Sequence, residues 1–248
     1  MLKFTLEGKT VLVTGASSGI GRGIAVACAE AGAKCILVAR NRERLEETLK
    51  HCKGGGHIIE EVDITEGLAI RQLIERLPTL DGLVQCAGIS DDHTPLKFLT
   101  SEFVDRVFNV NLKAPILFLA SLSKSKKLNK CASVIMLSSI ASYHASAAHS
   151  IYGATKGGIT AFVRGAALDL AGRKIRVNAI APGMVNTPLI NFSALTEEQR
   201  QANESRYPLK RYGEPEDIAG MAVYLLSDAA AWVTGQQFVI DGGFTTGG

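Results

Sequence analysis

A tyrosine and a lysine four residues apart, Tyr152 and Lys156, carry the clearest chemical signal in the sequence. They fall in a run with helical spacing, so their side chains lie on one face, one turn apart. A free tyrosine has a pKa of about 10, and a neighbouring ammonium lowers that pKa because it favours the phenolate. The pair therefore predicts a general acid that can also act as a base. Tyr143 lacks such a partner, because Ala147 stands four residues after it.

A glycine-rich loop near the start of the chain is the second signal. Its sequence is Val11-Leu-Val-Thr-Gly-Ala-Ser-Ser-Gly-Ile-Gly21, between an apolar run and a helical pattern. Glycine allows a tight turn and a close approach of ligand to backbone, and helix N-termini bind phosphate groups. The spacing G-x-x-x-G-x-G fits the usual dinucleotide fingerprint only loosely, so a purely structural turn is the alternative at this point.

Short apolar runs alternate with longer helical patterns along the chain. This alternation predicts an α/β fold: a Rossmann-type doubly wound parallel sheet in three layers. No linker or repeat interrupts this alternation, so we expect a single domain over residues 1–248. The alternation of strands and helices stops at about 184–212, where we expect a substrate lid. The expected strands are Thr10–Thr14, Lys34–Val38, Ile58–Val62, Leu83–Gln85, Ser133–Leu137, Arg176–Ala181 and Gln237–Ile240, and the expected helices include Ile20–Ala31, Arg42–Cys52 and Leu68–Leu77.

The composition excludes several classes of protein. The apolar stretches are far shorter than the roughly 20 residues of a membrane-spanning helix, and the N-terminus has no signal-peptide order. A formal charge of +3 does not indicate a nucleic-acid partner. Five cysteines without a Cys-x-x-Cys pair argue against a disulfide framework and a zinc site. We expect a cytoplasmic protein with no metal, membrane or nucleic-acid partner.

Three motifs together resemble the short-chain dehydrogenase/reductase family. They are Thr14-Gly-Ala-Ser-Ser-Gly-Ile-Gly21, Tyr152-Gly-Ala-Thr-Lys156 and the Pro182-Gly183 that ends a later strand, and they occur in the family's order. The resemblance implies an enzyme that interconverts a carbonyl and a secondary alcohol by hydride transfer with a nicotinamide cofactor. The overall pattern is similar to 3-oxoacyl-(acyl-carrier-protein) reductases.

The resemblance assigns the catalytic residues. Tyr152 matches the family's proton donor, and Lys156 matches the residue that assists it and bonds the nicotinamide ribose. Ser139 matches the serine that donates to the carbonyl oxygen as negative charge develops there. Ser138 is the alternative, because both serines follow a predicted strand.

Asn111 matches the family's fourth residue, which holds a water linked to the lysine. Pro115 supplies a physical reason, because proline has no N–H. If this segment is helical, the carbonyl of Asn111 loses its partner four residues on and is free to hold the relay water.

The resemblance also implies the cofactor contacts. The first motif holds the pyrophosphate, Asp63 meets the adenine amino group and Thr187 meets the nicotinamide carboxamide. Gln85-Cys86 replaces the family's Asn-Asn, so the bonds of those asparagines are not carried over, and we interpret Cys86 as a small buried residue. The implied cofactor contacts are Gly15, Ser17, Ser18, Gly19, Ile20, Gly21, Arg40, Asp63, Ile64, Ala87, Gly88, Tyr152, Lys156, Pro182, Gly183, Val185 and Thr187.

The end of the second predicted strand indicates which cofactor is used. An acidic residue there would bond the ribose hydroxyls and mark NAD, but the sequence has Arg40. Because a guanidinium pairs well with phosphate, Arg40, with Arg42 as a second candidate, predicts NADP(H), and NAD(H) is the alternative. A competing interpretation is that Arg40 only pairs with Glu43 or Glu46. Ser18 stands where NADP-preferring relatives often carry a second basic residue.

Substrate and partners remain open on the sequence. The predicted pocket walls are 90–96, 140–149 and the lid; they include His144, His149, Tyr143 and Tyr207 and favour no single substrate. The alternatives to an acyl reductase are a dehydrogenase of a sugar, polyol or steroid-like alcohol, and a non-catalytic dinucleotide-binding sensor.

The resemblance and a basic run suggest two kinds of protein contact. Family likeness implies a homotetramer through the helices after Pro115 and around Phe162, plus the carboxy-terminal strand. The basic run is either a solvated helix end or a surface for an acidic carrier protein. Its residues are Lys124, Lys126, Lys127 and Lys130, to which Arg173 and Lys174 add.

Overall fold

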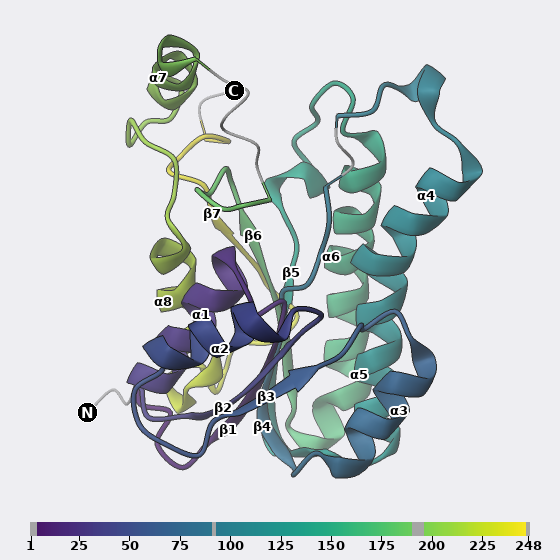
Figure 1. The fold of residues 1–248 in the computed structure, drawn as a ribbon, viewed down its shortest axis with the longest axis vertical. Coiled ribbons are helices and arrows are strands. Elements are labelled where there is room, and N and C mark those ends of the chain that lie inside the picture. Colours follow the sequence, from purple (N-terminus) through teal and green to yellow (C-terminus); the bar gives the residue numbers. More distant parts are fainter. Residues whose placement is uncertain (1–3, 91–92, 190–195, 247–248) are drawn as a thin grey trace.

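The computed structural model describes residues 4–90, 93–189 and 196–246 and has three layers, helices–sheet–helices (Figure 1). Within these residues, seven strands form one sheet in the order β3-β2-β1-β4-β5-β6-β7, and every pairing is parallel. The predicted fold class is confirmed. The strands are β1 (Thr10–Thr14), β2 (Lys34–Ala39), β3 (Ile58–Glu61), β4 (Leu80–Gln85), β5 (Leu128–Leu137), β6 (Arg176–Pro182) and β7 (Gln237–Ile240).

Helices cover both faces of the sheet. In Figure 1, α1, α2 and α8 lie on one side, and α3, α5 and α6 on the other. The helices are α1 (Gly19–Glu30), α2 (Arg42–His51), α3 (Gly67–Arg76), α4 (Ser101–Phe108), α5 (Ala114–Lys124), α6 (Ser150–Leu170), α7 (Glu197–Ser205) and α8 (Pro215–Leu226). Two shorter elements matter for the site: the π-turn η2 (Asn109–Lys113) and the 3₁₀ turn η3 (Ile140–Ser142).

The core consists of two apolar layers, one on each face of the sheet. Side chains alternate between the layers along each strand: Leu12 packs with α3, α5 and α6, whereas Val11 and Val13 pack with α1 and α8. Because both faces are covered, the central strands are mostly apolar, and all seven residues of β6 are buried, including the polar Arg176 and Asn178.

Two strands begin earlier than the sequence pattern predicts. β4 starts at Leu80 rather than Leu83, and β5 starts at Leu128 rather than Ser133, with unbroken burial along β5 only from Ala132 onward. Asn129, Lys130 and Cys131 interrupt the pattern; Cys131 has a φ of 67°, and the pairing of β4 with β5 shifts register here. A bulge of this kind places polar residues inside a strand, so hydrophobic periodicity does not detect its first half.

Residues 101–124 form helix α4, the π-turn and helix α5 in direct succession. Within the π-turn, hydrogen bonds span five residues: the Ala114 amide donates to the Asn109 carbonyl. Pro115 follows at the start of α5, where its missing N–H is tolerated. π-turns are rare and are often found at functional sites.

Two backbone hydrogen bonds join the two ends of the predicted lid region, and we call this junction, formed by residues 184–186 and 207–213, the base of the lid. The Gly213 amide donates to the Met184 carbonyl at 2.9 Å, and the Asn186 amide donates to the Gly213 carbonyl at 2.8 Å. Beyond this base, α7 has no buried residue, and residues 190–195 lie outside the described part of the chain. No helix in the described ranges is long and apolar enough to cross a membrane.

Candidate active site

The predicted cofactor and catalytic residues converge at one edge of the sheet. Because every pairing is parallel, the carboxyl ends of β1 to β6 lie at this edge, and the loops that follow them meet there. The strand order reverses between β1 and β4, which is where open α/β sheets leave a crevice for a ligand.

Lys156 is the buried cation at the centre of this edge. Only 6% of the residue is exposed, and its ammonium donates to the carbonyl of Leu137, the last residue of β5, at 2.9 Å. A Cβ on Gly88 would stand 3.7 Å from the ammonium, so the loop after β4 passes close by. Burial lowers the pKa of Lys156 to about 8, against the opposing effect of Cys86. Elements β4, β5 and α6 thus meet around one cation that can exchange a proton near neutrality.

The ring of Tyr152 lies among three other functional groups. The Lys156 ammonium is 5.4 Å from the ring centroid, and the His149 ring is 5.4 Å away between centroids. His93 stacks on His149 with 4.2 Å between centroids. Since His93 follows β4 and His149 follows β5, the two loops predicted as pocket walls meet beside the phenol.

The structure distinguishes between the two candidate serines. Ser138 is buried and its hydroxyl donates to the Lys156 carbonyl at 3.0 Å, which ties β5 to α6. The Ser139 hydroxyl accepts from the Ala141 amide at 3.1 Å in the turn next to α6. A Cβ on Gly153 would stand 2.8 Å from the Ala141 carbonyl oxygen, so this turn packs closely beside Tyr152. This arrangement favours Ser139 as the catalytic serine.

Asn111 is buried in the π-turn and holds the loop after β4 in place. Its side chain exchanges two hydrogen bonds with the backbone of Ile89: Nδ2 donates to the carbonyl at 2.9 Å, and Oδ1 accepts from the amide at 2.8 Å. A Cβ on Gly88 would stand 3.3 Å from Oδ1, so Asn111 and Lys156 flank the same glycine. The segment is a π-turn with hydrogen bonds over five residues, whereas the argument from Pro115 assumed a partner four residues on, so the free Asn111 carbonyl and the relay water stay predictions.

The glycine loop has the geometry of a phosphate cradle. Gly15 and Gly19 have φ values of 69° and 52°, which favour glycine. A Cβ on Gly15 would stand 2.9 Å from the Ala87 backbone, and one on Gly21 would overlap the Gly15 carbonyl. Ser18 occupies the N-cap of α1 without a side-chain capping bond, and the first turn has no acidic residue. The first amides of α1 and its dipole are therefore available to an anion, and these residues fit a pyrophosphate.

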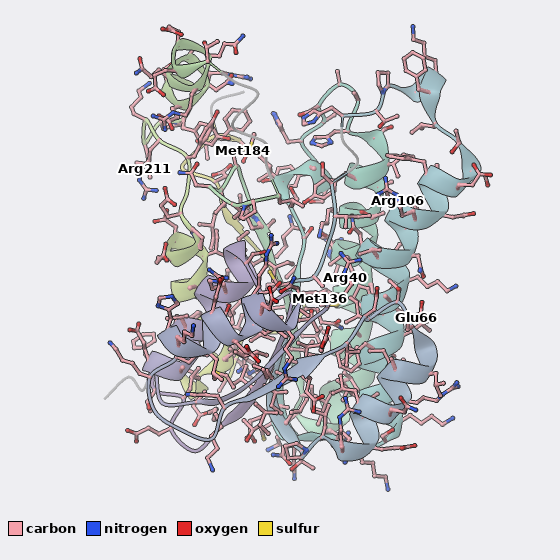
Figure 2. All side chains as sticks on the ribbon, viewed as in Figure 1. Arg40, Glu66, Arg106, Met136, Met184 and Arg211 are labelled. Carbon is pink, nitrogen blue, oxygen red and sulfur yellow. The ribbon has the colours of Figure 1, made fainter. Side chains whose placement is uncertain are left out.

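Arg40 pairs with Asp63, the residue predicted at the adenine end of the cofactor. Arg40 follows β2 (Figure 2), Asp63 lies just beyond β3, and their closest nitrogen and oxygen atoms are 3.8 Å apart. The interpretation of Arg40 as a partner of the next helix is wrong, because Glu46 pairs with Arg42 instead. With 72% of its side chain exposed, Arg40 can contact a ligand at this edge.

The segment after β6 closes the other side of the crevice. The Gly183 amide donates to the Ile240 carbonyl at 2.9 Å, and Val185 is 3% exposed. A Cβ on Gly19 would stand 3.0 Å from Thr187 Cβ. Thr187 therefore lies against the start of α1, beside the predicted pyrophosphate position.

Two residues that hold the glycine loop were missed by the sequence interpretation. The Thr14 hydroxyl accepts from the amides of Cys86 and Ala87 at 3.1 and 3.3 Å, which joins the ends of β1 and β4. Arg22 donates to the Ser17 carbonyl at 2.8 Å from the first helix. Thr14 stands inside the family motif, but residue spacing does not reveal a bond between strands that are distant in sequence.

Gln85 and Cys86, which replace the family's two asparagines, are both structural in this chain. Gln85 Nε2 donates to the Pro115 carbonyl at 2.6 Å and so links β4 to α5; its Oε1 is buried and has no partner among the described residues. Burial raises the pKa of the Cys86 thiol to about 12, against the opposing effect of Lys156. A thiol that stays protonated supports the interpretation that Cys86 is no nucleophile.

Tyr207, predicted on the pocket wall, lies inside the base of the lid. It is 5% exposed, stacks on Phe244 with 4.7 Å between centroids, and meets Tyr212 edge to face at 5.6 Å. Its assignment as a free pocket wall is therefore wrong, because the ring is covered by other aromatic rings.

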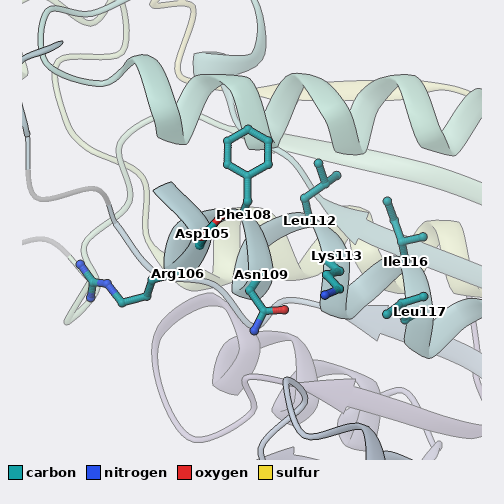
Figure 3. Close-up of a pocket in the computed structure, with 8 residues that line it drawn as sticks. All are labelled: Asp105, Arg106, Phe108, Asn109, Leu112, Lys113, Ile116 and Leu117. Carbon is teal, nitrogen blue, oxygen red and sulfur yellow. The ribbon is translucent and has the colours of Figure 1, made fainter. Parts of the chain in front are cut away.

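A surface groove of about 810 Å³ lies outside this site, on the helices α4 and α5. In Figure 3, Phe108 and Leu112 point toward the neighbouring helix, while Arg106 and Asn109 point away from it. None of its lining residues belongs to the predicted catalytic or cofactor-binding set.

Comparison with known proteins agrees with this geometry. A family model described as enoyl-(acyl carrier protein) reductase matches residues 15–245. A 3-oxoacyl-(acyl-carrier-protein) reductase of Thermotoga maritima is 34% identical over 244 residues, covering 96% of this chain and 98% of the relative.

Solved structures extend the likeness to the fold. A dehydrogenase/reductase from Sinorhizobium meliloti 1021 has a TM-score of 0.90 at 34% identity and covers 98% of both chains. A protein from Agrobacterium tumefaciens designated as a 2-deoxy-D-gluconate 3-dehydrogenase, with bound NADP, has a TM-score of 0.88 at 34% identity and covers 99% of this chain and 100% of its own. The motifs, the sheet order and these matches agree: the chain belongs to the short-chain dehydrogenase/reductase family of oxidoreductases.

Proposed function

We propose that this protein is an NADP(H)-dependent oxidoreductase that interconverts a carbonyl and a secondary alcohol, with 3-oxoacyl thioesters as the preferred substrates. The observation that carries the proposal is the convergence of Lys156, Tyr152 and the Ser139 turn beside the uncapped start of α1. The similarity to a 3-oxoacyl-(acyl-carrier-protein) reductase over nearly the whole chain supports this substrate class.

The side chains divide the chemistry among them. When bound, the nicotinamide gives hydride to the carbonyl carbon or takes it back. In the reductive direction Tyr152 donates a proton to the developing alkoxide, while Ser139 stabilises the negative charge by a hydrogen bond. Lys156 favours the phenolate that remains, and Asn111 keeps the loop after β4 in register with Lys156.

The first experiment is a titration of the purified protein with NADPH and with NADH, followed by nicotinamide fluorescence. The tighter complex is then mixed with 3-oxoacyl thioesters, keto sugars and simple diketones. Oxidation of NADPH by the thioesters supports the proposal. Turnover of sugars alone favours the second candidate, a sugar or polyol dehydrogenase, which the likeness to the gluconate-type protein supports. Cofactor binding without any turnover indicates the non-catalytic sensor.

Arg40→Asp is predicted to weaken NADPH binding on the order of 10- to 100-fold, the size of a lost charge-assisted hydrogen bond plus repulsion of the 2′-phosphate. NADH affinity should hold or improve, because an acid at this position suits the ribose hydroxyls. Fluorescence titration of both cofactors measures the effect. Arg42→Ala is the matched control, since Arg42 pairs with Glu46. Equal losses for NADPH and NADH would remove the assigned role of Arg40.

The homotetramer is proposed to form through α5 and α6, with the edge strand β7 as a second contact. Exposed apolar side chains support this choice: Leu117 on α5 is 53% exposed and Leu168 on α6 is 80% exposed. Leu117→Arg is expected to shift the mass measured by light scattering from a tetramer to a smaller species, because it places a charge in an apolar contact. Leu68→Arg, on α3, should leave the mass unchanged. A monomeric wild type would end the proposal.

A carrier-protein contact at the lysine run requires a second copy of the chain. Lys127 donates to the Leu77 and Glu75 carbonyls, and Arg173 to the Leu128 carbonyl, at the amino ends of β5 and β6. The ten residues of β5 separate that edge from Ser139 by roughly 30 Å. We therefore propose that a carrier bound there would serve the active site of a neighbouring subunit.

A cytoplasmic location is proposed because all five cysteines are free thiols, which fits a reducing compartment.

A further inference from the structure

We propose that Phe244 is a positioning residue for the substrate side of the active site, because its ring joins the wall that carries Ser139 to the base of the lid. The inference deepens the proposed function, on which its kinetic effects depend. It comes from the contacts around one half-buried ring near the end of the chain, the phenylalanine of Asp241-Gly-Gly-Phe244.

Three side chains from two segments hold the Phe244 ring. Tyr207 stacks on it with 4.7 Å between centroids and 28° between planes. His144 meets it edge to face at 5.2 Å, and the Arg206 guanidinium lies 5.3 Å from its centroid. His144 belongs to the loop after Ser139, whereas Arg206 and Tyr207 directly follow α7. Aromatic pairs and cation–π contacts of this geometry are attractive beyond simple burial.

Two hydrogen bonds reinforce the connection to the Ser139 loop. The hydroxyls of Tyr143 and Thr245 are 3.1 Å apart, and Gln237 Nε2 donates to the Ser142 hydroxyl at 3.3 Å. The loop that follows Ser139 is therefore attached at three points: Ser142 to the start of β7, and Tyr143 and His144 to the turn that follows β7.

The carboxy-terminal segment itself is a tight turn capped by Asp241. The Asp241 carboxylate accepts from the Gly243 amide at 2.9 Å, and from the amide and hydroxyl of Thr245 at 2.9 and 2.6 Å. Gly243 has a φ of 82°, and a Cβ there would stand 2.9 Å from Pro208. Because this turn continues β7, the ring of Phe244 is fixed relative to the sheet.

The lid depends on this anchor for its position. Helix α7 has no buried residue, so it gains little from packing of its own. Among residues 196–213, which the structure describes, only Tyr207 and Tyr212 are buried, at 5% and 2% exposed. Removing the Phe244 ring leaves Tyr207 without its stacking partner and His144 without its edge contact, so the base of the lid and the loop after Ser139 both gain freedom.

The residues predicted to bind the pyrophosphate and adenine ends of the cofactor belong to the other half of the sheet. The glycine loop, Arg40 and Asp63 follow β1, β2 and β3, on the opposite side of the sheet order from β7. Loss of the ring should therefore affect binding of the carbonyl substrate and leave cofactor binding intact.

The experiment compares Phe244→Ala and Phe244→Tyr, with Trp232→Ala as a control because Trp232 is 99% exposed. For Phe244→Ala we expect KM for the carbonyl substrate to rise about tenfold, the scale of one lost aromatic pair. The dissociation constant of NADPH should not change. Phe244→Tyr keeps the ring and should restore KM, and the control should match the wild type. An unchanged KM, or an equal loss of NADPH affinity, overturns the proposal.

Trypsin cleavage provides a readout that does not depend on turnover. The chain offers Arg200, Arg206, Lys210 and Arg211 as cleavage sites in the lid. Phe244→Ala should be cut there several-fold faster than the wild type, whereas Phe244→Tyr and Trp232→Ala should not. Equal cleavage of Phe244→Ala and the wild type overturns the role of Phe244, whether or not any carbonyl compound is reduced. A failure to reduce any carbonyl compound counts against the proposed function alone. If Phe244→Ala does not fold, Phe244→Leu takes its place in both measurements.

Discussion

Tyr152→Phe is expected to lower turnover on the order of 10²- to 10⁴-fold while NADPH still binds, because the variant lacks the hydroxyl that exchanges a proton with the substrate. The ring itself remains, so its contacts with His149 and with the Lys156 ammonium persist. Steady-state kinetics with saturating NADPH, together with a fluorescence titration of the cofactor, separate loss of chemistry from loss of binding.

Tyr224→Phe is the matched control. Tyr224 lies on α8 and packs against Phe4 with 6.0 Å between ring centroids, outside the predicted site. Its loss of a hydroxyl should leave turnover near the wild-type value. Substantial turnover in Tyr152→Phe would mean that another group donates the proton, and the catalytic assignment would fail.

Lys156→Met is expected to reduce turnover at least on the order of 10²-fold and to change the pH dependence of stability. Methionine keeps a long apolar side chain but removes the ammonium that favours the phenolate. A variant that loses turnover but has the same free energy of unfolding as the wild type at every pH would contradict the lowered pKa of the buried Lys156 ammonium.

The sign of the stability effect follows from the lowered pKa. Burial lowers the pKa of Lys156 from 10.5 to about 8. Below pH 8 both states carry the charge, and the native state bears its full desolvation cost. Between pH 8 and 10.5 the unfolded chain binds more protons than the native chain, so the free energy of unfolding rises with pH. Urea unfolding at several pH values should show this rise in the wild type, with a smaller slope in Lys156→Met.

Much of the catalytic arrangement could be predicted from the sequence because it depends on local spacing. Tyr152 and Lys156 are one helical turn apart, and the glycine loop follows directly on β1. Parallel strands then bring the loop ends to one edge without further information. The positions of positive φ in the glycine loop could also be expected from the sequence, because few residues other than glycine tolerate that conformation.

The parts that escaped prediction depend on contacts between distant segments. The bond from Gln85 to the Pro115 carbonyl spans 30 residues, and that from Thr14 to the Cys86 amide spans 72. Tyr207 was placed on the pocket wall because it lies in a polar loop, but its partner Phe244 is near the end of the chain. Hydrophobic periodicity reports which face of an element is buried, not which residue covers it.

The π-turn limits which insertions and deletions this chain can tolerate. A π-turn amounts to one extra residue accommodated within an α-helix. Deleting one residue at 109, 110, 112 or 113 would impose α-helical spacing from Ser101 to Lys124 with Pro115 in the helix interior, and one end would rotate by about 100° relative to the other. Asn111 could then no longer face Ile89 while α5 kept its packing against the sheet. The length of this segment is thus as constrained as the identity of its asparagine.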